Sequence, residues 1–160
     1  ALRYTFDMGE FGRLAPVVAI QKSKGDHRES NDTDYTFWCV GTRYYLGDWM
    51  VGALYSEDKL DGYYAQTSTD EVTELTAVYN VNDKWALRAG YRYLDNKGGD
   101  ELQLKDTTLE VQFKLTARSS IYTSYVDRNG QRGDYNGQEV SFGGAHADES
   151  YYHLGLRYEL

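Results

Sequence analysis

The sequence predicts an all-β fold, namely an antiparallel up-and-down transmembrane β-barrel with eight or nine strands visible in this chain. Three observations support this prediction: apolar and polar residues alternate along most of the 160 residues, short and long connections alternate, and charged strand residues keep to one face. The 16 tyrosines and 16 glycines, against a single proline, favour pleated strands over helices. The longest apolar run, residues 14–20, is too short for a membrane-spanning helix, which needs about 20 residues.

Residues 1–13 come first, and they are read either as an additional strand or as a lead-in to the barrel. Tyr4, Phe6 and Met8 alternate with polar residues, and the glycine-rich stretch 9–12 predicts a turn. Alternation then predicts eight strands in order, near residues 14–24, 35–46, 49–57, 72–82, 84–94, 106–116, 119–127 and 150–160. Residues 1–160 are therefore expected to be a single barrel domain or the C-terminal portion of a larger one.

The connections between these strands favour a membrane barrel over a soluble sandwich. Tight turns are expected at Gly47-Asp48, Asn82-Asp83 and Ala117-Arg118. The intervening connections are expected to be long polar loops, at residues 25–34, 57–71, 95–106 and 127–149. Outer-membrane barrels have this rhythm of short periplasmic turns and longer outer loops.

Tyrosine and tryptophan side chains are predicted to form two girdles on the apolar face, one near each end of the strands. Aromatic residues of this kind mark the two interfaces of a membrane, although strands also favour aromatics in general. The predicted girdle residues are Tyr44, Trp49, Tyr55, Tyr79, Trp85, Tyr91, Tyr93 and Tyr152.

The charged residues of the strands all fall on the opposite, polar face. Arginine or lysine on a lipid-facing midplane costs roughly 2–4 kcal/mol, so one-sided placement indicates a wet or ion-paired interior. The arginines either line a water-filled pore or pair with Glu74 and Glu110 to fill a small barrel, because eight strands enclose just enough space for side chains. The candidate pore-lining residues are Arg43, Glu74, Arg88, Arg92, Glu110, Lys114 and Arg157.

The last ten residues, Tyr151-Tyr152-His153-Leu154-Gly155-Leu156-Arg157-Tyr158-Glu159-Leu160, resemble the closing strand of Gram-negative general diffusion porins. Residues 85–93 and 120–125 are similar to porin strands as well, so the resemblance extends over most of residues 35–160. It implies a sixteen-stranded homotrimer in which Arg43, Arg88 and Arg92 belong to a basic wall. It also implies that the C-terminal strand is read by the barrel assembly machinery, although the usual final phenylalanine is Leu160 here.

The function expected from these observations is an outer-membrane porin of a Gram-negative bacterium, a channel for passive diffusion of ions and small hydrophilic solutes. Membrane lipid and lipopolysaccharide are its expected surroundings. The alternative is a small closed eight-stranded barrel that binds or adheres through its acidic loops. The four long loops hold 18 acidic and 6 basic residues, which predicts a weak cation preference if the protein conducts.

Other functional classes have little support in the sequence. The net charge of −8 disfavours nucleic acid as a partner. His27, His146 and His153 are not placed beside a serine on the lipid-facing surface, so no catalytic site is expected. The loop carboxylates match no EF-hand pattern, and we expect neither a metal site nor a cofactor.

Overall fold

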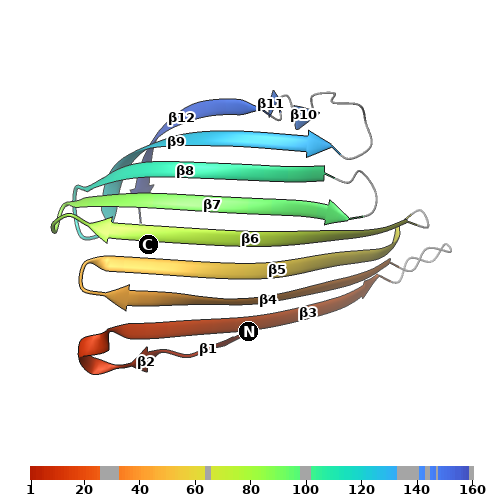
Figure 1. Cartoon of the computed structure of the whole chain (residues 1–160), viewed down its shortest axis with the longest axis horizontal. Helices are drawn as coiled ribbons and strands as arrows, with labels where there is room; N and C mark the ends of the chain where they lie inside the picture. Colours follow the sequence, from red (N-terminus) through yellow and green to blue (C-terminus); the bar gives the residue numbers. More distant parts are fainter. Residues whose placement is uncertain are drawn as a thin grey trace.

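A computed structural model describes residues 1–25, 33–63, 66–97, 102–132, 141–142, 145–146 and 148–158 (Figure 1). Nearly all of this part of the chain is strand, with one 3₁₀ turn, η1, at Gly9–Phe11. The strands are β1 (Leu2–Arg3), β2 (Phe6–Asp7), β3 (Arg13–Gly25), β4 (Thr33–Leu46), β5 (Trp49–Tyr63), β6 (Gln66–Asn80), β7 (Trp85–Lys97), β8 (Leu102–Lys114), β9 (Ser119–Arg132), β10 (Ser141–Phe142), β11 (Ala145–His146) and β12 (Glu149–Tyr158).

The strands form one antiparallel up-and-down sheet, as the sequence predicts. Its order is β1-β3-β4-β5-β6-β7-β8-β9-β12, with β2 also paired to β3. Every neighbouring pair is antiparallel, and β10 and β11 form a separate small hairpin. Within the described residues the two edges of the sheet do not pair with each other, so the sheet is curled but open (Figure 1).

The three predicted tight turns are confirmed. Gly47 adopts φ +55° between β4 and β5, a left-handed conformation that glycine tolerates without a steric penalty. Asn82 closes the turn before β7, where its Oδ1 accepts the backbone N–H groups of Lys84 at 2.9 Å and Trp85 at 3.0 Å. Thr116 does the same before β9 through its hydroxyl oxygen, 3.0 Å from the Ser119 nitrogen.

The prediction of long polar loops is wrong in extent, because the strands continue well beyond their apolar segments. The predicted loop at 57–71 is mostly strand, since β5 runs to Tyr63 and β6 starts at Gln66. Strand β9 likewise reaches Arg132 inside the predicted loop 127–149. On these extensions polar residues lie on both faces of the sheet, which hides the alternation although the backbone ladder continues.

Within residues 1–13, β1 and β2 together form an edge strand over residues 2–7 that is interrupted opposite Pro16. Leu2 pairs with Val18 and Phe6 with Leu14, a register that places Tyr4 opposite Pro16. The Tyr4 N–H donates to the Pro16 oxygen at 3.3 Å, but proline has no N–H to return the bond. The missing bond separates β1 from β2, and the predicted turn follows at η1.

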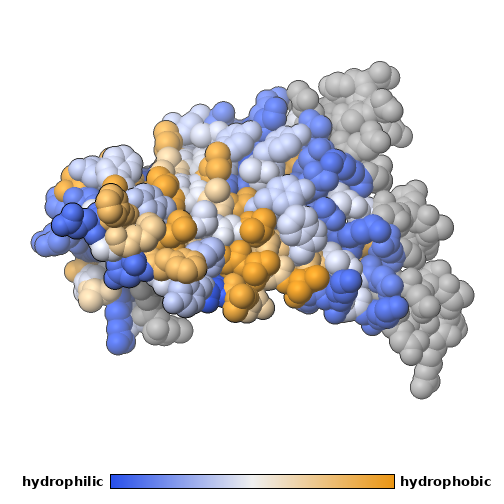
Figure 2. Space-filling view, turned by 60° about the horizontal axis from the view of Figure 1, so that its bottom comes forward, coloured by the Kyte–Doolittle hydropathy of each residue, from blue (hydrophilic) through white to orange (hydrophobic). Residues whose placement is uncertain are grey.

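The sheet has two contrasting faces and almost no core. Within the described residues, no large side chain is fully buried, and Ala86, Leu104 and Val126 are among the few buried apolar residues. One face instead exposes large apolar side chains, such as Leu109 at 56% and Leu154 at 81%. We call this the apolar face; Figure 2 shows hydrophobic residues gathered across the middle of the molecule, with hydrophilic residues beside them. No helix in the described part of the chain is long and apolar enough to cross a bilayer.

Candidate functional site

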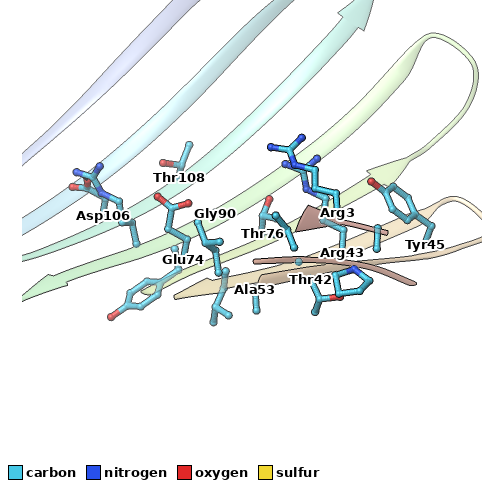
Figure 3. Close-up of a pocket in the computed structure, with 18 of the residues that line it drawn as sticks. Arg3, Thr42, Arg43, Tyr45, Ala53, Glu74, Thr76, Gly90, Asp106 and Thr108 are labelled. Carbon is cyan, nitrogen blue, oxygen red and sulfur yellow. The ribbon is translucent and has the colours of Figure 1, made fainter. Parts of the chain in front are cut away.

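The opposite face of the sheet, which we call the cavity face, carries the charged strand residues. It borders a cavity of about 670 Å³ lined from β1 to β9 (Figure 3). Cross-strand pairing aligns these residues in rows, because side chains directly opposite each other in a sheet point to the same side. One row contains Leu54, Glu74, Arg92, Asp106 and Arg128 on five consecutive strands.

The floor of the cavity is formed by small side chains. Arg43 pairs with Gly52, and the same row continues through Thr76, Gly90 and Thr108. Gly90 borders the cavity, and a Cβ added there would make only ordinary van der Waals contact, 3.8 Å from the Thr108 Cβ, so a side chain fits without a clash. Because Gly52 and Gly90 have no side chains, this row leaves room for solute or water beside the neighbouring row of charged residues.

Asp106 is the centre of one ionic cluster on the cavity face. Arg128 donates to it twice, from Nε to Oδ1 at 2.7 Å and from Nη2 to Oδ2 at 3.3 Å. Arg92 approaches from the other side, with Nη2 3.1 Å from Oδ2. Asp106 is only 9% exposed, so two guanidinium groups compensate one nearly buried carboxylate.

Glu110 is the centre of a second cluster, closer to the tight-turn end. Arg88 Nε lies 3.5 Å from its Oε1 and Arg157 Nη2 lies 3.6 Å from its Oε2. Arg88 also donates to Gln112 Oε1 at 2.7 Å, and Gln112 donates to the Ser120 hydroxyl at 2.6 Å. These contacts link side chains of β7, β8, β9 and β12 and hold them against the cavity face of the sheet.

Three charged residues that line the cavity have no such partner. Arg3, Arg43 and Glu74 make no hydrogen bond or ion pair within the part of the chain that the structure describes. Arg3 comes from the edge strand β1, and Arg43 and Glu74 come from β4 and β6. Figure 3 shows the two arginines on one side of Thr76 and the Glu74 carboxylate on the other.

The structure places all seven candidate pore-lining residues on the cavity face but gives them different surroundings. Arg43, Glu74 and Arg92 border the cavity itself, whereas Arg88, Glu110 and Arg157 form the second cluster. Lys114 pairs with Ser120 at the tight-turn end and is exposed. Of the two carboxylates that were expected to pair with arginines, Glu110 does so and Glu74 does not.

Sequence reasoning missed Arg3, Asp106 and Arg128, which all line the cavity. Asp106 falls at the boundary between the predicted loop 95–106 and the predicted strand 106–116, and Arg128 falls in the predicted loop 127–149. The alternation of the sequence could have revealed both residues. Asp106 lies on the same face of its strand as Thr108 and Glu110, and Arg128 lies on the same face as Ser124 and Val126. Arg3 has the parity of Thr5 and Asp7 in the edge strand.

The predicted girdle residues lie on the apolar face, where cross-strand pairing brings several into ring contact. Trp49 stacks on Tyr79 with ring centroids 4.5 Å apart, near the tight turns. Nearer the other end, Tyr152 lies 5.1 Å from Tyr125, and Tyr55 lies 5.3 Å from Trp38. The Tyr44 hydroxyl donates to the Phe11 carbonyl at 2.7 Å, which ties η1 to the wall. The remaining three, Trp85, Tyr91 and Tyr93, lie on the same face of β7, and Trp85 contacts Phe113 with ring centroids 4.7 Å apart.

We call Trp38, Tyr55, Tyr125 and Tyr152, at the end of the strands away from the tight turns, the outer aromatic row. Beyond this row, the cavity face carries acidic residues. Asp58 and Asp70 face each other across β5 and β6. The Tyr35 hydroxyl donates to Asp58 at 3.1 Å, and Asn96 donates to Asp70. Burial raises the pKa of Tyr35 above its ordinary value, and the hydrogen bond to Asp58 raises it further, so this phenol stays neutral and remains a donor.

Nothing among the described residues assembles a metal site, because no three His, Cys, Asp or Glu side chains converge. His153 is exposed and pairs with Ser124 on the cavity face, away from the lipid-facing surface. His27 and the side chain of His146 lie outside the described residues, as do Asp26, Glu29 and Asp32.

Comparison with known proteins agrees with this architecture. Residues 4–99 match the Gram-negative porin family. The anion-selective porin of Comamonas acidovorans has a similar structure, with a TM-score of 0.73 at 16% identity over 96% of this chain and 46% of that chain. The outer-membrane expressed OmpT of Vibrio cholerae gives 0.64 at 20% identity over 92% of this chain and 50% of that chain.

The chain thus spans about half the length of these two solved outer-membrane proteins. A search of curated proteins gave no significant match. The family match covers more than half of the chain, from β2 to the end of β7, and includes Arg43, Glu74 and Arg92. The chain therefore belongs to the Gram-negative porin family and lies in the bacterial outer membrane as part of an antiparallel β-barrel wall.

Proposed function

We propose that the protein forms a water-filled channel through which ions and small hydrophilic solutes diffuse passively. The observation that carries this proposal is the contrast between the two faces of one sheet: an apolar face with exposed leucines, and a cavity face with arginines, carboxylates and about 670 Å³ of open space. A wall of this kind separates lipid from water. The candidate pore-lining residues are proposed to act as its aqueous lining.

Closure of the barrel requires partners for both edges of the sheet. An unpaired strand edge in hydrocarbon leaves backbone groups without hydrogen bonds, at a cost of several kcal/mol for each group. The edges at β1/β2 and β12 do not pair with each other within the described residues. We therefore propose that these strands are the C-terminal portion of a larger barrel wall, in which residues 1–7 act as one strand.

The surroundings and partners of the protein follow from the same proposal. The apolar face contacts membrane lipid, and the strand ends beyond the outer aromatic row meet lipopolysaccharide. Strand β12 is proposed to be recognised by the barrel assembly machinery, and the complete protein is proposed to assemble as a homotrimer. The proposed activity is passive and involves no catalysis.

A small closed barrel that binds through its acidic loops remains the second candidate. The observation in its favour is that Asp106 and Glu110 are each shared by two arginines, as in a barrel interior filled by ion pairs. The cavity of about 670 Å³ that Gly90 lines favours the channel. Whether the reconstituted protein conducts ions distinguishes the open channel from the closed barrel.

The test is to reconstitute the full natural chain in planar bilayers and to measure conductance in potassium chloride. We expect stepwise increases of conductance, which Gly90→Leu reduces because its side chain enters the cavity. The matched control is Ala89→Leu, one residue away on the apolar face, which should leave conductance unchanged. A folded protein without conductance would overturn the channel and favour the closed barrel.

A further inference from the structure

Within the described chain, the cavity holds charges of both signs that have no ionic partner, and their arrangement restricts the solutes that fit it. Arg92 lies directly opposite Glu74 across β6 and β7, yet its guanidinium is directed to Asp106 instead, 3.1 Å away. Glu74 is therefore left without an ionic partner in the described chain. Arg43 faces Gly52, which has no side chain to offer, and Arg3 reaches the same cavity from the edge strand.

Sheet geometry fixes the spacing between these charges. Arg43 and Glu74 lie two strands apart and two residues apart along the strand direction, since Leu54 pairs with both Gly41 and Glu74. Strand spacing and rise then separate their Cα atoms by about 12 Å. Both side chains are long enough to shorten this span to a few ångströms between charged groups. The separation suits one small molecule that carries two opposite charges.

The floor between the charges is open and weakly polar. Thr76 lies between Glu74 and the two arginines, with its hydroxyl directed upward into the cavity (Figure 3). Gly52 and Gly90 flank Thr76 in the same row and add no side chains. A volume of about 670 Å³ lies within the range of about 300–1,000 Å³ common for ligand pockets.

We propose that this cavity binds zwitterionic solutes, namely free amino acids or short peptides, during their passage. The carboxylate of the solute would be held by Arg43 and Arg3, because guanidinium groups match carboxylates with two parallel hydrogen bonds. The ammonium group would be held by Glu74, and the Thr76 hydroxyl would accept from or donate to the groups between them. This inference rests on the proposed channel, and it adds the class of solute that the channel favours.

The proposal is tested with the full natural chain in detergent micelles, by titration calorimetry with three small probes. Glycylglycine carries both charges, N-acetylglycine carries only the carboxylate, and glycinamide carries only the ammonium group. We expect glycylglycine to bind about three- to fivefold more tightly than either of the others, since each partly hydrated ion pair contributes modestly. In bilayers, glycylglycine should reduce the ionic current at lower concentrations than the other two.

Single substitutions assign the two ends of the solute. Arg43→Gln should abolish the preference for glycylglycine over glycinamide, and Glu74→Gln should abolish the preference over N-acetylglycine. The matched control is Lys114→Gln, which removes a charge from the same face at the tight-turn end, outside the cavity. This control should bind all three probes as the natural protein does.

The outcomes separate this inference from the channel itself. Equal affinity for the three probes, or equal effects of Lys114→Gln and Arg43→Gln, would overturn the zwitterion site while conductance remained. Tight binding of N-acetylglycine equal to that of glycylglycine would show a simple anion site instead. Selective binding of glycylglycine without any conductance would support the site and refute the channel.

Discussion

Among single residues, Asp106 is held by two arginines on the cavity face, whereas Glu74 in the same row has no ionic partner among the described residues. Replacing Asp106 with asparagine leaves Arg92 and Arg128 facing each other without the carboxylate between them. Breaking a buried ion pair costs roughly 3–5 kcal/mol, and the 41% exposure of the Arg92 side chain reduces this to about 2–3 kcal/mol. Urea titration in lipid vesicles should show this loss in the free energy of unfolding.

Glu74→Gln is the matched comparison, because it removes a carboxylate from the same row of the sheet. Glu74 has no ionic partner in the described chain, so its replacement should change the free energy of unfolding by less than about 0.5 kcal/mol. Similar losses for Asp106→Asn and Glu74→Gln would contradict the assignment of Asp106 as the centre of the cluster.

A second residue-scale prediction concerns the two faces of the wall. Leu109→Arg places a charge on the apolar face in the middle of β8, where it should cost roughly 2–4 kcal/mol in lipid. Arg92→Leu acts on the cavity face, and Asp106 keeps the two bonds from Arg128, so its cost should be about 1 kcal/mol. Lipid refolding titrations measure both, with Leu87→Arg as a repeat of the first on β7.

A larger loss of stability for Arg92→Leu than for Leu109→Arg would show that the two faces have been assigned the wrong way round.

The sequence was sufficient to assign these faces, because the alternation of apolar and polar residues shows directly which side of a strand meets lipid. It could not show which charges pair. Arg88 and Arg43 have the same pattern in the sequence, yet cross-strand register brings Glu110 to Arg88 and only Gly52 to Arg43.

At the scale of elements, the edge strand depends on one proline. The register places Tyr4 opposite Pro16, where one of two ladder bonds is missing. Pro16→Ala restores an N–H that can donate to the Tyr4 carbonyl and should join β1 and β2 into one continuous strand. Amide hydrogen exchange at Leu2 and Phe6 should slow by about three- to tenfold, in line with one additional backbone hydrogen bond.

The amides in the middle of β7 serve as the internal control for this experiment, since they are distant from the edge and should exchange at unchanged rates. Faster exchange at Leu2 or Phe6 would contradict the explanation and show that the proline stabilises the edge by stiffening the chain.

The ends of the strands could not be predicted from alternation, for a reason specific to this fold. Glu57 and Lys59 on β5 face the same side as Tyr55, and Glu71 and Lys97 pair beside them. The hydrogen bond from Lys97 to Glu71 raises the pKa of Lys97 above its ordinary value, so this ammonium group stays charged well above neutral pH. Where a strand extends beyond its apolar segment, charged residues replace apolar ones on the side that continues the apolar face. Such a segment has the composition of a polar loop, so the sequence alone does not identify it as strand.

At the scale of the whole molecule, the described strands change the expected balance of charge around the pore. The weak cation preference was predicted from acids counted as loop residues at the mouth. Several of these acids, including Glu57, Asp61 and Glu71, lie on the side of the extended strands that continues the apolar face, away from the cavity. Charges on the cavity face of the described strands are more balanced. The basic residues are Arg3, Arg13, Arg43, Arg88, Arg92, Lys114, Arg128 and Arg157, and the acidic residues are Asp7, Asp58, Asp70, Glu74, Asp106, Glu110 and Glu149.

We therefore expect nearly equal permeabilities for potassium and chloride, and Arg43 to have a larger influence on their ratio than any paired arginine. Asp106 and Glu110 already compensate their neighbours, whereas Arg43 presents its full charge to the cavity. Arg43→Gln should raise the cation-to-anion permeability ratio by about 1.5- to twofold at low salt, and less at 1 M, where the screening length falls to about 3 Å.

Reversal potentials across a potassium chloride gradient measure this ratio, with Lys114→Gln as the control near the tight-turn end. Because Lys114 lies outside the cavity, its replacement should shift the reversal potential less than Arg43→Gln does. A cation preference in the natural protein that survives at high salt would mean that acids at the mouth dominate after all. Equal shifts for the two variants would mean that the narrowest part of the pore lies away from the cavity, since a charge acts most strongly where the water-filled path is narrowest.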